Sequence, residues 1–93
     1  MQVAKDLDFN NIVWERPSFL KYKDSKGNYR KYFPDFYLLD YNVYLDPKND
    51  YLIKRDIEKI RRVCLYNNVK VFILNEDQLC WKKIRTIILT NGL

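Results

Sequence analysis

The sequence predicts a small α/β domain that spans residues 1–93, with a mixed four-stranded sheet flanked by helices in the order αβββαβα. Stretches rich in aromatic and β-branched residues alternate with segments of helical periodicity. Hydrophobic residues make up 47% of the chain, which is enough for one packed core, and 93 residues leave no room for a second one.

The first half of the chain predicts a short helix and three strands. Val3, Ala4 and Leu7 indicate that the first nine residues form the end of a short helix. Two aromatic and β-branched stretches follow, the first kinked at Pro17 and the two joined by a turn around Gly27. A second turn leads to a short third strand, which completes an antiparallel meander. The expected strands are residues 12–23, 29–39 and 42–48.

The second half predicts a helix, a strand and a last helix. Residues 52–67 carry an apolar stripe at helical spacing, and residues 69–74 form a continuous apolar strand. Because a helix joins this strand to the third one, the two should run parallel. Glu76 and Asp77 suit the start of the last helix, which Asn91-Gly92 would close. The expected inner face of the helix 52–67 consists of Ile53, Ile57, Ile60 and Cys64. That of the last helix consists of Cys80, Ile84, Ile87 and Ile88.

The chain is basic and lacks histidine, and both features narrow the range of functions. It carries 17 Lys and Arg against 12 Asp and Glu, a formal net charge of +5. A basic small domain is biased towards nucleic acid as a partner. Without histidine there is no His-based metal finger, no His general base and no His-containing catalytic triad. Any hydrolysis must therefore depend on carboxylates, lysine and a metal ion.

Nothing in the sequence predicts a membrane segment or secretion. No apolar run approaches the roughly 20 residues that span a bilayer. Acids near the N-terminus stand where a secretory signal would be apolar. Cys64 and Cys80 lack metal-site spacing and fall on expected apolar helix faces, so we expect free buried thiols. These features predict a cytoplasmic, intracellular protein with no membrane partner.

Two carboxylates and a lysine are expected to meet at the ends of neighbouring strands. Asp35 lies in the second expected strand, and Asp46-Pro47-Lys48 ends the third. Asp35, Asp46 and the backbone carbonyl of Pro47 would supply the oxygens that Mg²⁺ or Mn²⁺ prefers. The cation would neutralise a phosphodiester and activate water, and Lys48 would orient or deprotonate that water or stabilise charge on phosphorus. The alternative is a surface turn without a ligand, since Asp-Pro-Lys-Asn is also a turn sequence.

These residues and their order resemble the PD-(D/E)XK nuclease superfamily. The resemblance rests on Pro34-Asp35, on Asp46-Pro47-Lys48, and on the phrases YFPDFYL and DIEKIRRVCLYNNVKVFIL, and it covers nearly the whole chain. It implies a restriction-endonuclease-like core and a Mg²⁺-dependent DNA endonuclease of homing, very-short-patch-repair or resolvase type, from a phage or bacterial cell. A single small domain has one active centre, so cutting both strands would require a homodimer or a second encounter.

The chain departs from the family pattern at two places. Many members carry a glutamate on the first helix, and that place falls at residues 1–2, so Gln2 would stand in for it. Glu15 is the nearest substitute acid, with a surface ion pair as the alternative role. Pro47 occupies a position where the family has a strand-forming residue. It keeps its carbonyl but lacks an N–H, which suits a strand end or a bulge.

Basic residues near the expected site are candidates for contacts with the DNA backbone. Those on the first hairpin can reach a groove, and those on the following helix lie next to the acids. For the helix, the alternative is a solvated face with Asp56 and Glu58 as local partners. The DNA-binding candidates are Lys21, Lys23, Lys26, Arg30, Lys31, Lys54 and Arg55.

Two functions other than catalysis stay open at this stage. A catalytically inactive nuclease fold would serve as a DNA-binding or interaction module, and Pro47 and the missing glutamate favour it. A plain α/β protein-interaction domain would show no salt-sensitive affinity for DNA. Among enzymes, the alternative to a homing-type nuclease is a structure-specific one, such as a junction resolvase.

Overall fold

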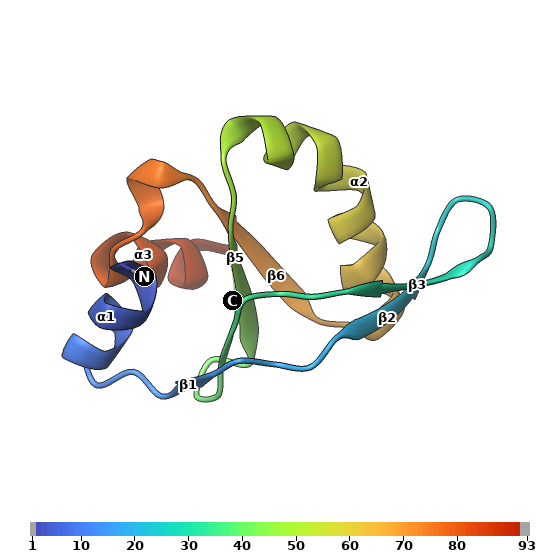
Figure 1. The fold of residues 1–93 in the computed structure, drawn as a ribbon. Coiled ribbons are helices and arrows are strands. Elements are labelled where there is room, and N and C mark those ends of the chain that lie inside the picture. The colour runs from blue at the N-terminus through green and yellow to red at the C-terminus, as the bar shows by residue number, and fades with distance from the viewer. Residues whose placement is uncertain (1, 92–93) are drawn as a thin grey trace.

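The computed structural model describes residues 2–91 and shows an α/β fold with two separate sheets (Figure 1). The main sheet has the strand order β1-β4-β5-β6, and β2 and β3 form a two-stranded hairpin. In chain order the elements are α1 (Gln2–Phe9), β1 (Trp14–Glu15), β2 (Leu20–Lys23), β3 (Tyr29–Tyr32), β4 (Phe36–Leu38), β5 (Val43–Pro47), α2 (Asp50–Asn67), β6 (Lys70–Leu74), the 3₁₀ turn η1 (Glu76–Gln78) and α3 (Trp81–Asn91). The α/β class and the mixed four-stranded sheet are confirmed, whereas the order of elements differs from αβββαβα.

The main sheet combines antiparallel and parallel pairs. Strand β4 pairs antiparallel with β1 and with β5, while β5 and β6 run parallel and are connected by α2. In this register Phe36 lies opposite Leu45, and Asp46 is paired with Ile73 of β6. Asp46 therefore belongs to a central strand with neighbours on both sides.

Proline divides both long strands expected in the first half of the chain. The stretch 12–23 contains Pro17 and becomes β1 and β2, and the stretch 29–39 contains Pro34 and becomes β3 and β4. Proline has no N–H to donate to a ladder, so pairing is interrupted there. Both breaks lie between the main sheet and the hairpin. The chain thus leaves the sheet after β1 and returns to it at Phe36, directly after Asp35.

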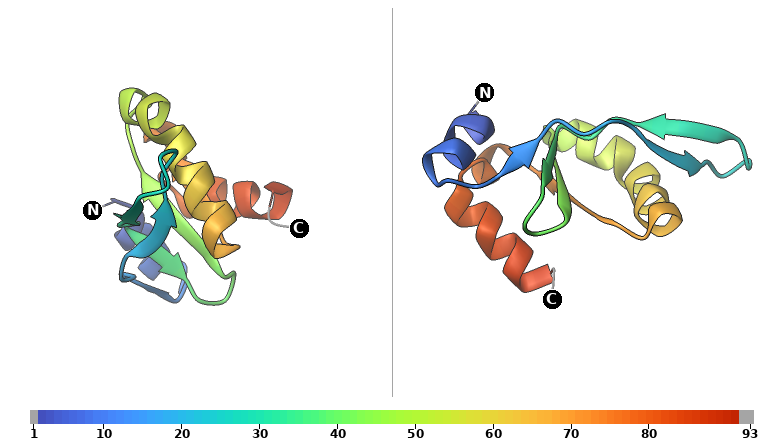
Figure 2. Two further views of the ribbon diagram at one scale, coloured as in Figure 1. Left: turned by 90° about the vertical axis from the view of Figure 1, so that its right-hand side faces the viewer. Right: turned by 90° about the horizontal axis from the view of Figure 1, so that it is seen from below.

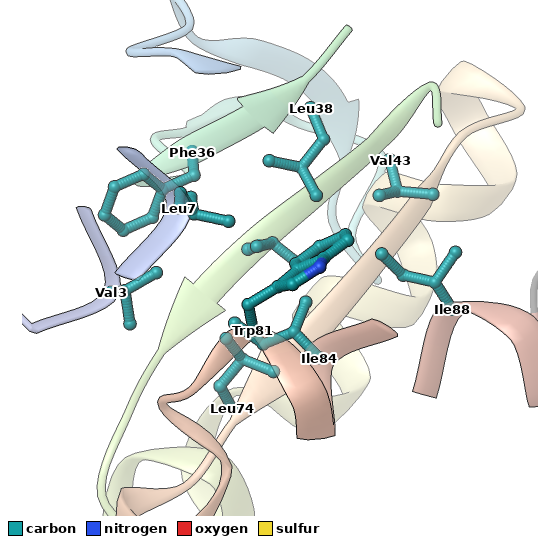
Figure 3. Close-up of a cluster of buried hydrophobic side chains, with 10 residues drawn as sticks. Val3, Leu7, Phe36, Leu38, Val43, Leu74, Trp81, Ile84 and Ile88 are labelled. Atoms are coloured by element: carbon teal, nitrogen blue, oxygen red, sulfur yellow. The ribbon is translucent and has the colours of Figure 1, made fainter. Parts of the chain in front are cut away.

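Helices cover both faces of the main sheet and create two hydrophobic cores (Figure 2). Successive residues of a strand point to opposite faces, so Leu45 and Asp46 face different layers. The larger core lies between the sheet, α1 and α3 (Figure 3). The smaller one joins α2 to the hairpin and to Val71 and Ile73 of β6. The buried members of the larger core are Val3, Leu7, Phe36, Leu38, Val43, Leu45, Leu74, Trp81, Ile84 and Ile88.

Helix α2 is capped at both ends, and its buried face differs from the expected one. The Asn49 side chain accepts a hydrogen bond from the Leu52 N–H, and Asn68 ends the helix in the left-handed conformation, with a φ of 52°. The stripe expected through Ile57 is wrong, because Ile57 is 59% exposed. The buried residues are Asp56, Ile60 and Val63. An acid thus lies on the face that was expected to be wholly apolar.

The C-terminal helix begins later than expected. Glu76 opens the 3₁₀ turn, and α3 starts only at Trp81. Gly92, which was expected to close this helix, lies outside the described residues. The buried residues of α3 are Trp81, Ile84 and Ile88. Within residues 2–91, no helix combines the length and the apolar character that crossing a membrane requires.

Candidate active site

The candidate site is built around Asp46, a buried carboxylate in the central strand β5. Its side chain points away from the larger core, because the neighbouring Leu45 packs into that core. Asp46 therefore lies on the α2 side of the sheet, with only 3% of its surface exposed. A buried carboxylate costs free energy unless polar partners replace the lost water. Among the described residues, Asp46 has two such partners.

Tyr32 and Lys48 bind the same oxygen of Asp46. The Tyr32 hydroxyl, at the end of β3, donates a hydrogen bond to Asp46 Oδ2. The Lys48 Nζ lies 3.4 Å from the same oxygen. Within the described part of the chain, both partners of this carboxylate thus meet at Oδ2. Oδ1 is the oxygen that can accept a further ligand.

Lys48 connects two acids from different elements. Its backbone N–H donates to the Leu74 carbonyl at 2.9 Å, which holds the chain beside β6 directly after β5 ends. Pro47, which lacks an N–H, closes β5 and so occupies a strand end. The Lys48 ammonium lies between the Oδ2 atoms of Asp46 and Asp56, at 3.4 Å and 3.5 Å. With 15% of its side chain exposed, the ammonium is held largely out of water.

Asp56 is the second buried acid and is placed by α2. Arg55 binds it through two nitrogens, with Nε at 2.9 Å and Nη2 at 3.1 Å, and the Lys59 Nζ lies 3.6 Å away. The hydrogen bond from Arg55 lowers the pKa of Asp56 to about 2, and Lys59 and Lys48 act in the same direction. Asp56 is therefore a firmly ionised partner for the Lys48 ammonium.

Burial has the opposite effect on Asp46. Loss of water raises the pKa of Asp46, and the charge of Asp35 acts in the same direction, against the Tyr32 hydrogen bond and Lys48. Burial, followed by the hydrogen bond to Asp46, also raises the pKa of Tyr32, so its hydroxyl remains a proton donor. A cation placed beside these acids would lower the pKa of Asp46.

Asp35 lies next to Asp46 at the point where the chain re-enters the sheet. The register pairs Phe36 with Leu45, and continuing it by one residue places Asp35 opposite Asp46. Residues opposite each other in an antiparallel pair point to the same face, with Cβ atoms about 5 Å apart. The influence of the Asp35 charge on the pKa of Asp46 is consistent with this proximity. Asp35, Asp46 and Lys48 thus gather on the α2 face of the sheet.

The two candidates for a third acidic position, Gln2 and Glu15, belong to opposite faces of the sheet. Gln2 is exposed at the start of α1, which packs into the larger core on the face away from Asp46. Glu15 is paired with Tyr37 across β1 and β4. It is therefore a diagonal neighbour of Asp35, at a backbone separation of about 7–8 Å. Of the two, Glu15 shares the face of the site and Gln2 does not.

The oxygen donors suit one hard cation with few protein ligands. Within residues 2–91, no cluster of three or more His, Cys, Asp or Glu residues is placed to hold a metal ion. The register brings the carboxylates of Asp35 and Asp46 together, and Pro47, whose carbonyl was expected as a further ligand, follows Asp46 in β5. Mg²⁺ binds through one or two carboxylates and keeps several waters, so such a set is sufficient. The raised pKa of Asp46 marks a carboxylate whose charge a cation would stabilise.

We compared the chain with protein families, curated proteins and solved structures. No family model, no curated protein and no solved structure matches this chain. The resemblance to the PD-(D/E)XK nucleases therefore depends on the sequence motifs alone.

The basic residues around the site are engaged in different ways. Arg55 is held by Asp56 at 2.9 Å, and Arg30 is held by Asp24 at 3.0 Å. Lys54 is exposed on α2. The remaining candidates are exposed lysines of the hairpin, namely Lys21, Lys23, Lys26 and Lys31. The hairpin lysines are therefore better placed than the arginines to contact an external anion.

Two residues of the site have no catalytic role in the sequence prediction. Tyr32 falls within YFPDFYL but has no expected function, and Asp56 is expected only as a partner of helix cations. A signal for Asp56 exists, because it lies four residues before Ile60 and seven before Val63, on the same face of the helix. No local pattern points to the contact of Tyr32, since it reaches Asp46 from a different sheet.

Proposed function

We propose that this chain is a metal-dependent nuclease that hydrolyses phosphodiester bonds in DNA, with Mg²⁺ or Mn²⁺ as its cofactor. The proposal is carried by the group of Asp35, Asp46 and Lys48 on one face of the sheet. Two adjacent carboxylates can hold a hard cation against a phosphate, and an ammonium beside them adds positive charge. The net charge of +5 suits a polyanionic substrate.

Each side chain of the group has a distinct task. When bound, the cation would act as a Lewis acid on the phosphate. Asp35 and Asp46 would supply its carboxylate oxygens, through Oδ1 of Asp46 because Oδ2 is taken by Tyr32 and Lys48. Tyr32 fixes the orientation of the Asp46 carboxylate. Asp56 holds Lys48, so the ammonium keeps a partner when Asp46 binds the cation, and it can orient water or stabilise charge on the phosphate.

A cleavage assay tests the proposal. Supercoiled plasmid DNA is incubated with the protein and Mg²⁺ or Mn²⁺, and we expect nicked and linear products that disappear with EDTA. Asp46→Asn should abolish cleavage, while Asp40→Asn, an exposed acid of the turn before β5, is the matched control. A wild-type protein that cuts with neither ion, or an Asp46→Asn variant that cuts normally, contradicts the proposal. The ratio of nicked to linear plasmid reports whether two copies act together.

A catalytically inactive DNA-binding module is the second candidate. It is favoured by the engagement of Asp46 Oδ2 with Tyr32 and Lys48. Binding to DNA that weakens with added salt, without cleavage in either ion, would support this function over catalysis.

A further inference from the structure

The β2–β3 hairpin packs one face against the protein and presents the other to solvent. Leu20, Tyr22 and Tyr32 pack with α2 in the smaller core. Because side chains alternate along a strand, the residues between them point the other way. The hairpin extends beyond the main sheet (Figures 1 and 2), and on this second face the ring of Tyr29 lies 6.5 Å from the ring of Tyr66 of α2.

Lysines and aromatic rings make up this outer face, which we name the lysine–aromatic face. Two registered pairs, Lys21 with Lys31 and Lys23 with Tyr29, define it, and a ring contact of 6.1 Å between Phe19 and Phe33 extends it towards the main sheet. The aromatic residues are well exposed, at 41% for Phe19, 56% for Tyr29 and 67% for Phe33. The members of the face are Phe19, Lys21, Lys23, Tyr29, Lys31 and Phe33.

The lysines of this face lie over the rings instead of next to acids. Lys21 and Lys23 place their Nζ atoms 4.2 Å and 5.0 Å from the centre of the Tyr29 ring, and Lys31 lies 4.6 Å from the Phe19 ring. Among the described residues, no carboxylate lies within ion-pair distance of these three lysines. The face therefore combines exposed rings with positive charge that the fold itself does not neutralise.

Lys21 and Lys31 place two positive charges at one level of the hairpin. They lie directly opposite each other in the register. Like charges in such a pair destabilise the two strands. The only hairpin acid, Asp24, is already bound by Arg30. An anion that binds across the pair would relieve this repulsion.

We propose that the lysine–aromatic face binds a single-stranded segment of nucleic acid, with bases stacked on the rings and phosphates held by the lysines. Single strands expose the faces of their bases, and aromatic residues next to cations are the surface that binds them without sequence preference. A duplex hides its base faces and would use the lysines alone. The proposal does not depend on nuclease activity, but combined with it the substrate would be DNA with an unpaired stretch.

Fluorescence anisotropy in EDTA tests this binding without cleavage. A labelled single-stranded DNA is compared with the duplex and with the single-stranded RNA of the same sequence. We expect tighter binding of single strands than of duplex, with a log–log salt slope that falls by about 0.7 for Lys21→Ala. Tyr29→Leu and Phe33→Leu should each weaken binding roughly ten-fold. The RNA arm shows whether the sugar matters.

Matched variants separate stacking from general effects. Tyr29→Phe keeps the ring and should bind like the wild type, and Phe9→Leu removes an exposed ring from α1 and should also bind normally. Thermal unfolding confirms that each variant folds. Equal or tighter binding of duplex, or unchanged binding by both leucine variants of the face, overturns the proposal. Because EDTA is present throughout, a failure of metal-dependent cleavage leaves this result unaffected.

Discussion

At the scale of the residue, Asp46 Oδ2 connects three parts of the fold. The oxygen binds the Tyr32 hydroxyl from the hairpin and the Lys48 ammonium, which in turn binds Asp56 of α2. Side chains in one buried polar network influence each other, so their substitutions are not additive. Catalysis and stability must therefore be measured together for every variant of this group.

Lys48→Ala should remove cleavage but not binding. A cation beside the developing charge acts on the transition state, so its loss should lower the cleavage rate by about 100- to 1,000-fold. One phosphate contact among several contributes little to affinity, so the dissociation constant for DNA should change by less than about three-fold. Lys54→Ala, on the exposed side of α2, is the control. A Lys48→Ala variant that cuts at the wild-type rate would exclude Lys48 from the mechanism.

Asp56→Asn should destabilise the protein in a pH-dependent way. The pKa of Asp56 is lowered from 3.8 to about 2, so its ionised form stabilises the fold above pH 3.8, and this stability is lost as the pH falls through about 2. We expect a loss of about 2 kcal/mol at neutral pH that shrinks on acidification.

Urea unfolding at several pH values measures this effect. Glu58→Gln is the control, because Glu58 forms exposed pairs with Arg61 and Arg62, at 3.7 Å and 3.4 Å. A difference between Asp56→Asn and the wild type that stays constant down to about pH 2 would show that the ionised carboxylate is not the source.

At the scale of the element, helices and strands could be predicted from the sequence where a pattern of neighbouring residues determines them. The expected helix 52–67 and strand 69–74 correspond to Asp50–Asn67 and Lys70–Leu74, because helical spacing and an apolar run are local patterns. The first two strands could not be predicted in full. A proline shows where pairing can stop, but not that the chain then leaves one sheet for another.

For the candidate site too, only the contacts that follow from local patterns could be predicted. Asp35, Asp46 and Lys48 could be expected near one another, because Asp35 directly precedes β4, and Asp46 and Lys48 lie at the end of the neighbouring strand β5 and directly after it. The burial of Asp56 could not be predicted in the same way, since it depends on which face of α2 turns towards the sheet. Tyr32 depends on the path of the hairpin, which is a property of the whole fold.

Helix α2 carries Asp56 in its second turn, so its N-terminal cap should affect both stability and the site. The Asn49 side chain accepts a 2.9 Å hydrogen bond from the Leu52 N–H. Asn49→Ala should lower the free energy of unfolding by about 1 kcal/mol, while Asn49→Asp keeps an acceptor and should be close to neutral. Chemical denaturation of the two variants gives the comparison. Equal losses in both would show that the cap does not contribute.

At the scale of the whole molecule, cation binding at Asp46 should stabilise the fold, because an ion that binds only the folded state shifts the unfolding equilibrium. At about a hundred times its dissociation constant, Mn²⁺ should add about 2.7 kcal/mol. In a domain of this size that corresponds to a rise in Tm of roughly 10–20 °C. Thermal unfolding with and without Mn²⁺ measures the shift. It should vanish in Asp46→Asn and persist in Asp40→Asn, and a shift retained by both would place the ion elsewhere.

Tyr32 belongs to the hairpin through its backbone and to the main sheet through its hydroxyl. Its direction depends on the pairing of Leu20 with Tyr32, which follows from the turn where Gly27 adopts a φ of 81°. Slippage by one residue turns every side chain of a strand to its other face. A one-residue insertion that shifted this pairing would send the hydroxyl into solvent and strip a buried carboxylate of its donor. The tip of the hairpin, although it lies outside the body of the protein, can therefore change in length only in ways that preserve the pairing behind it.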